Sequence, residues 1–156
     1  MKLPRILLAL SAVCLVTASL VTPTHAHEDA TAHVKKKAGP NGGRVITKVT
    51  PNVEFFVLPD RKLKLTFLDD AGKPVAPSGQ TVTLTGGDRL NPTKLTFVAK
   101  DGALISEQPL PAGDNVPVVL QLKMAPEASS VTEKFGVNFS TCPECKLKEY
   151  ACICGH

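Results

Sequence analysis

The stretch Lys62-Leu-Lys-Leu-Thr-Phe-Leu68 decides the fold class of this chain. Its apolar residues Leu63, Leu65 and Phe67 alternate with two lysines and a threonine. Successive side chains of a β-strand point to opposite faces, so this period of two predicts a strand with one buried face. The intervening polar residues, Thr66 among them, are expected on the solvent face.

Further short strands, divided by turns, are predicted on both sides of this stretch. The predicted strands are residues 44–49, 52–58, 62–68, 81–85, 93–99, 103–106, 116–123 and 131–140. The chain contains 13 prolines and shows no convincing helical period, which argues against helices. These features predict an all-β fold, a single antiparallel β-sandwich of the immunoglobulin or fibronectin type, with a small closed barrel as the alternative.

The apolar residues that these strands turn to one side form the predicted core. They are Phe55, Leu63, Leu65, Phe67, Val82, Leu84, Leu95, Phe97, Leu120, Leu122, Val137 and Phe139. No cysteine lies between residues 27 and 141, so no disulfide can staple this core. Aspartates such as Asp60, Asp69 and Asp88 fall in predicted turns, where turn formation and solubility are their expected roles.

The first 26 residues are predicted to be a cleaved signal peptide. Lys2 and Arg5 precede an apolar run over residues 6–20, and small residues around Ala26 offer a cleavage site. The run is shorter than the roughly 20 residues that span a bilayer. Four segments follow from this division: signal peptide 1–26, disordered leader 27–38, β-sandwich domain 39–140 and cysteine-rich tail 141–156.

Composition and residue types exclude two classes of function. Without Lys2 and Arg5 the chain keeps 16 basic and 14 acidic residues, and it has no tryptophan and one tyrosine. Nucleic-acid binding normally needs a basic stripe or stacking aromatics, so no nucleic-acid partner is expected. The strand region holds no histidine to act as a base and no Gly-x-Ser-x-Gly elbow, so no enzyme activity is expected.

The tail carries the residues with the most distinctive chemistry. It contains Cys142, Cys145, Cys152 and Cys154, followed by His156. Thiolates are soft ligands, and four of them suit Zn²⁺ in a tetrahedron or Cu⁺ at lower coordination. The two-residue spacing of the first pair is that of a zinc knuckle, so these four cysteines are the predicted ligands, with His156 as an auxiliary one.

Three other fates of the thiols stay open. Exported cysteines commonly form disulfides, and a nested pairing of Cys142 with Cys154 and Cys145 with Cys152 would make a small staple. A Cys-Pro-x-Cys spacing is also used in thiol exchange, but the surrounding βαβ pattern is missing here. Haem attachment would need a histidine directly after the second cysteine, and Lys146 stands there.

Two short motifs resemble a group of small exported bacterial proteins. Gly39-Pro-Asn-Gly-Gly-Arg44 matches their Gly-Pro-x-Gly-Gly-Arg opening, and Asp69-Asp-Ala-Gly-Lys-Pro-Val75 matches a turn that follows it. The resemblance covers residues 39–125, and similar segments occur near heavy-metal efflux and periplasmic metal-handling systems. It implies an exported β-sandwich and metal handling, and it carries over no functional residue.

The sequence therefore predicts a non-enzymatic metal-binding protein in periplasmic metal homeostasis, periplasmic or secreted. The predicted partners are a Zn or Cu ion and, as a further candidate, a periplasmic protein, with no stable membrane insertion after signal cleavage. The alternative is a structural or protein-interaction β-sandwich whose tail cysteines form two disulfides.

Overall fold

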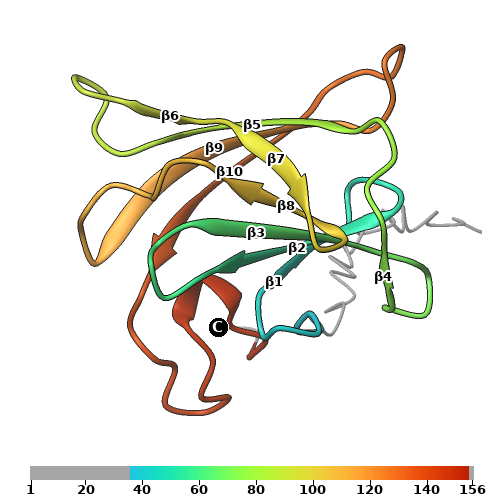
Figure 1. Ribbon diagram of the computed structural model, residues 1–156. Coiled ribbons are helices and arrows are strands. Elements are labelled where there is room, and N and C mark those ends of the chain that lie inside the picture. Colours follow the sequence, from blue (N-terminus) through green and yellow to red (C-terminus); the bar gives the residue numbers. More distant parts are fainter. Residues whose placement is uncertain (1–35, 155–156) are drawn as a thin grey trace, which may run out of the picture. The chain divides into compact units, whose positions relative to one another are not determined.

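Ten strands in two antiparallel sheets dominate the computed structural model, which describes residues 36–154 (Figure 1). The predicted signal peptide, most of the predicted leader and His156 lie outside these residues. The prediction of an all-β, antiparallel fold is confirmed. The one helical segment in the described range is the 3₁₀ turn η1 (Glu149–Ala151), and no helix there is long and apolar enough to cross a membrane.

The first sheet has six strands in the order β1-β2-β3-β8-β7, with β4 paired to β3. Their bounds are β1 (Arg44–Ile46), β2 (Asn52–Val57), β3 (Leu63–Leu68), β4 (Pro74–Val75), β7 (Phe97–Lys100) and β8 (Ala103–Ser106). The turn between β7 and β8 is the predicted hairpin, since Asp101 and Gly102 both have positive φ, 51° and 72°. The very short β4 was not predicted.

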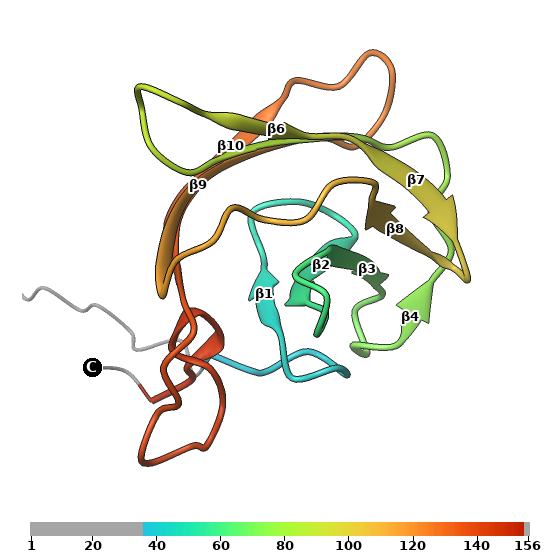
Figure 2. The same ribbon diagram turned by 60° about the vertical axis from the view of Figure 1, so that its left-hand side comes forward.

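The second sheet has four strands in the order β10-β9-β5-β6. Their bounds are β5 (Thr81–Gly86), β6 (Thr93–Leu95), β9 (Asn115–Lys123) and β10 (Val131–Asn138). The predicted strand over residues 93–99 is in fact two strands in different sheets. The chain leaves the second sheet after β6 and enters the first sheet as β7, so the two sheets meet at this corner (Figure 2).

Both sheets contribute to one hydrophobic core. Ten of the twelve predicted core residues are buried, and Phe97 and Phe139 are half-buried and pack against them. Residues outside the prediction also belong to the core, notably Val53 of β2 and Tyr150 of η1. The core therefore extends into the tail.

Thr66 is not on a solvent face as predicted, because it is only 3 % exposed. It pairs in register with Glu54 of β2, so the two side chains lie on the same face of the sheet. The Gly39–Gly43 turn covers this part of the face and leaves Glu54 fully buried. The strand and its buried face with Leu63, Leu65 and Phe67 were predicted correctly. The burial of its other face under the Gly39–Gly43 turn was not predicted.

The predicted role of the aspartates in turns is confirmed at three positions. Asp60 accepts a hydrogen bond from the N–H of Lys62 at 3.1 Å. Asp69 accepts from the N–H of Lys73 at 2.8 Å, and Asp88 accepts from the N–H two residues further on at 2.7 Å. These carboxylates shape turns and are not gathered into a site.

Candidate metal centre

The first cysteine pair lies in a tight loop that follows β10. An isolated bridge between Thr141 and Lys148 closes the loop, and inside it the N–H of Cys142 donates to the carbonyl of Leu147 at 2.8 Å. Lys146 has a positive φ of 62°, and its N–H donates to the carbonyl of Cys142 at 3.1 Å. The loop reverses within a few residues, which brings the side chains of the first pair to one side.

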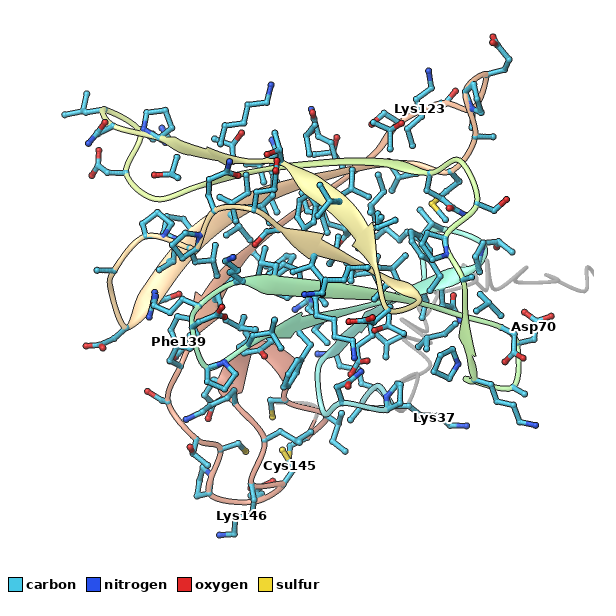
Figure 3. The ribbon with its side chains drawn as sticks, viewed as in Figure 1. Lys37, Asp70, Lys123, Phe139, Cys145 and Lys146 are labelled. Carbon is cyan, nitrogen blue, oxygen red and sulfur yellow. The ribbon has the colours of Figure 1, made fainter. Side chains whose placement is uncertain are left out.

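The 3₁₀ turn η1 directs the chain back, so that the second cysteine pair lies beside this loop. The N–H of Glu149 donates to the carbonyl of Ser140 at 2.9 Å, which starts the turn beside the end of β10. The N–H of Cys152 then donates to the carbonyl of Glu149 at 3.1 Å and ends it. Figure 3 shows Cys145 in this part of the tail, with the side chain of Lys146 directed away from the strands.

The four sulfur atoms form one cluster. The Sγ of Cys142 lies 3.6 Å from that of Cys152 and 3.8 Å from that of Cys154, and the Sγ atoms of Cys145 and Cys152 are 3.8 Å apart. All four lie within 4.8 Å of one another. Cys142 is fully buried, and the other three cysteines are half-buried.

These separations fit four free thiols that ligate one ion. A disulfide needs about 2.05 Å between its sulfurs, and none of the four described cysteines forms one. A tetrahedral zinc with Zn–S distances of about 2.3 Å places its sulfurs about 3.8 Å apart. The four cysteines can therefore hold one metal ion, as predicted.

Backbone donors favour ionisation of one thiol. The N–H groups of Ile153 and Leu147 donate to the sulfur of Cys145 and lower its pKa to about 6. Burial and the neighbouring thiols raise the pKa of Cys154. The N–H of Cys154 lowers the pKa of Cys152, but burial and the thiols of the first pair outweigh it and the net shift is upward. The pKa of Cys145 is therefore lowered, whereas the pKa values of Cys152 and Cys154 are raised.

Tyr150 fastens the centre to the core. Its hydroxyl accepts a hydrogen bond from the N–H of Val57 at 3.1 Å. Its ring packs edge-to-face against Phe55 at 5.9 Å and Phe139 at 6.2 Å between ring centroids. Burial raises the pKa of the Tyr150 hydroxyl, and the carboxylate of Glu54 adds to this effect against the Val57 hydrogen bond.

The tail also lies against the seam between the two sheets. β1 and β10 are the outer strands of their sheets, and η1 contacts both of them (Figures 1 and 2). Across the seam Lys48 Nζ is 2.7 Å from Glu133 Oε1, and the guanidinium of Arg44 lies 4.6 Å from the ring centroid of Phe135. The tail therefore helps to close the open side of the two-sheet structure.

A groove of about 700 Å³ borders the centre. β1 and the turn over residues 69–72 contribute to its lining, together with Cys152 and Ile153 from the tail. One side of the cysteine cluster therefore faces a space that solvent can enter.

The structure brings four of the five predicted site residues together, and the fifth, His156, lies outside the described residues. Sequence reasoning missed Tyr150, although it is the one tyrosine of the chain and stands between the two cysteine pairs. Comparison with protein-family models, curated proteins and solved structures finds no match to this chain. The function is therefore inferred from the thiols and their surroundings.

Proposed function

We propose that this is a non-enzymatic metal-binding protein that holds one Zn²⁺ or Cu⁺ ion in periplasmic metal homeostasis. The observation that carries the proposal is the cluster of Cys142, Cys145, Cys152 and Cys154, whose sulfurs lie within 4.8 Å of one another. His156 is proposed as an auxiliary ligand, since it follows Cys154 by two residues.

The number of ligands favours Zn²⁺ over Cu⁺. Zn²⁺ in structural sites takes four ligands in a tetrahedron, and the sulfur separations of 3.6 and 3.8 Å fit that geometry. Cu⁺ is softer than Zn²⁺ and often uses fewer ligands, so it would leave one or two thiols outside its coordination. A zinc ion with four thiolates has no open position for a reacting water, which supports a binding role and not catalysis.

The compartment is proposed on the pattern of residues 1–26. A short basic start, an apolar run and a small-residue cleavage site are the features of a secretory signal. The protein would then be periplasmic or secreted, with no stable membrane insertion after cleavage. Residues 1–26 contain no twin arginine, so export as an unfolded chain is the default. Metal would then be loaded outside the cytoplasm, because the site forms only once the tail has folded.

We also infer that the two sheets form a single β-sandwich of the immunoglobulin or fibronectin type. The common core of the two sheets supports this inference. The sheet switch between β6 and β7 joins the layers at one side, and the tail covers the seam between β1 and β10 at the other.

A second candidate function is a structural or protein-interaction β-sandwich with two tail disulfides. The observation that favours it is that both nested pairs, Cys142 with Cys154 and Cys145 with Cys152, have sulfurs only 3.8 Å apart. In that case the partner would be another periplasmic protein.

Metal analysis and thiol titration on protein purified without a chelator test both candidates. We expect about one ion per chain, and four thiols that react only after a chelator is added. The double variant Cys142→Ser with Cys145→Ser should lose the ion, whereas a control with Leu90→Ser and Val98→Ser, both exposed, should keep it. Thiols released only by a reductant, with no metal, would establish the disulfide alternative.

A further inference from the structure

The Gly39–Arg44 motif has no part in the metal centre as described so far. Its backbone forms a closed turn, in which the N–H of Gly39 donates to the carbonyl of Gly43 at 3.0 Å. The N–H of Gly42 donates back to the carbonyl of Gly39 at 2.9 Å, and Ala38 bridges to Arg44. The turn folds over β2 and covers one of its side chains, that of Glu54.

Glu54 is a fully buried carboxylate that this turn satisfies. Its Oε1 accepts hydrogen bonds from the N–H groups of Asn41 and Gly43, each at 2.8 Å. Its Oε2 accepts from the side-chain amide of Asn41 at 2.6 Å. Burying a carboxylate is costly unless such donors replace water, so the turn and Glu54 depend on each other.

The glycines of the motif allow this close approach. A Cβ on Gly39 would collide with the Glu54 carboxyl group, and one on Gly43 would collide with the carbonyl of Phe55. Any larger residue at either position would push the turn off β2. The motif is therefore a cradle built for the Glu54 side chain.

The same turn supports the cysteine loop. A Cβ on Gly42 would lie 3.5 Å from Cδ2 of Leu147, so the Leu147 side chain packs on the turn. The backbone of Leu147 makes two contacts within the centre. Its carbonyl accepts from the N–H of Cys142, and its own N–H donates to the sulfur of Cys145.

β2 thus holds the tail from both of its faces. Glu54 acts on the outer face through the turn and Leu147, and Phe55 acts on the inner face through the ring of Tyr150. Adjacent residues of a strand point to opposite faces, so one strand can brace the tail on two sides.

We propose that Glu54 is a positioning residue for the metal centre, which fixes the Gly39–Gly43 turn against Leu147 and so orients Cys142 and Cys145. This inference rests on the proposed metal-binding function. Groups behind the ligands of a metal commonly change its affinity 10–100-fold when they are removed. Glu54 is expected to act in that range although it contacts no sulfur itself.

The test compares Co²⁺ binding to the whole chain and to Glu54→Gln by absorption spectroscopy. The glutamine NH₂ group would face N–H donors of the turn, so the cradle should loosen and the affinity for Co²⁺ should fall about 10-fold or more, with altered cobalt bands. Thr66→Val is the matched control, since Thr66 pairs with Glu54 in register and its buried hydroxyl has no partner among the described residues. It should bind Co²⁺ like the unchanged protein.

Leu147→Ala keeps the Glu54 cradle intact and removes only its contact with the loop, so it should reproduce the loss of affinity with unchanged circular dichroism. This second variant decides the matter if Glu54→Gln does not fold. Equal Co²⁺ affinity and equal spectra for the unchanged protein and the folded variants would overturn the role of Glu54 and leave the proposed function standing. An unchanged protein that binds neither Co²⁺ nor Cu⁺ would overturn both.

Discussion

The hydroxyl of Tyr150 accepts a hydrogen bond from the backbone N–H of Val57 at 3.1 Å, across 93 positions of the chain. Val57 ends β2, and Tyr150 stands between the two cysteine pairs, so this contact joins the core to the candidate metal centre. The edge-to-face contact with Phe55 lies beside it. Substitutions in the core at this point are therefore expected to alter the arrangement of the thiols. Changes at the thiols are likewise expected to alter the stability of the core.

Tyr150→Phe should destabilise the fold by about 1 kcal/mol. The ring packing is kept, but the partly buried N–H of Val57 loses its acceptor, and a lost hydrogen bond of this kind costs about that much. Urea unfolding followed by circular dichroism measures the change. Tyr150→Ala should cost more, roughly 3–5 kcal/mol, because it also empties the space of the ring. Equal stability of Tyr150→Phe and the unchanged protein would show that the hydrogen bond does not contribute to the free energy of unfolding.

Removal of the metal should lower the stability of the whole domain. An ion that binds only the folded protein adds about 4 kcal/mol when its concentration is a thousand times its dissociation constant. Thermal unfolding with and without one equivalent of Zn²⁺ should show a clear shift in Tm. Cys142→Ser with Cys145→Ser provides the comparison, since its Tm should no longer respond to Zn²⁺. A similar response in that variant would place the ion elsewhere.

The metal should protect the thiols from oxidation. Without it, a mild disulfide oxidant should join the four cysteines into two intrachain bonds, since each sulfur has another within 4.8 Å. Four hydrogens leave the protein and reduce two molecules of the disulfide reagent. Mass spectrometry detects the loss of about 4 Da. Zinc-loaded protein should react much more slowly, and equal rates with and without Zn²⁺ would argue against coordination by these sulfurs.

Gly43→Ala should destabilise the protein by more than Gly72→Ala does. At Gly43 the new methyl group would meet the carbonyl of Phe55 and the Glu54 side chain, and overpacking of this kind costs about 1–3 kcal/mol. At Gly72, whose φ is +77°, nothing lies near the new atom, so the cost is that of the backbone conformation alone, about 1 kcal/mol. Denaturant unfolding of the two variants gives the comparison. The reverse order would remove the close-approach argument for the motif.

The strands were predictable where one face is buried and the pattern is local. The alternation of Leu63, Leu65 and Phe67 located β3, and all three residues are buried. The same reasoning merged β6 with β7, because apolar alternation continues through Thr96 while the chain changes sheets. Side-chain period reports which way a residue faces and says nothing about which neighbour its strand pairs with.

The candidate site was predictable in its ligands and not in its attachment. The spacing of the four cysteines indicated a cluster, since short loops bring such residues together wherever the tail lies. The burial of Tyr150 depends on Phe55 and Phe139. Phe55 lies far away in the sequence, in β2, and Phe139 directly follows β10. Likewise, nothing in the sequence links the Gly39–Arg44 motif to Glu54, the residue that accepts its hydrogen bonds. Long-range packing of this kind leaves no local periodic signal.

The contact between β2 and η1 also has a consequence for the order of events during synthesis. A chain made from its amino end presents β2 long before Tyr150 exists. Phe55 and the outer strands β1 and β10 therefore stay uncovered until η1 packs against them. Contacts that close over such long separations form slowly, and open strand edges invite pairing with other chains in the meantime. The chain is therefore most vulnerable to aggregation until its tail has docked, and a metal ion that orders the tail after export would shorten that interval.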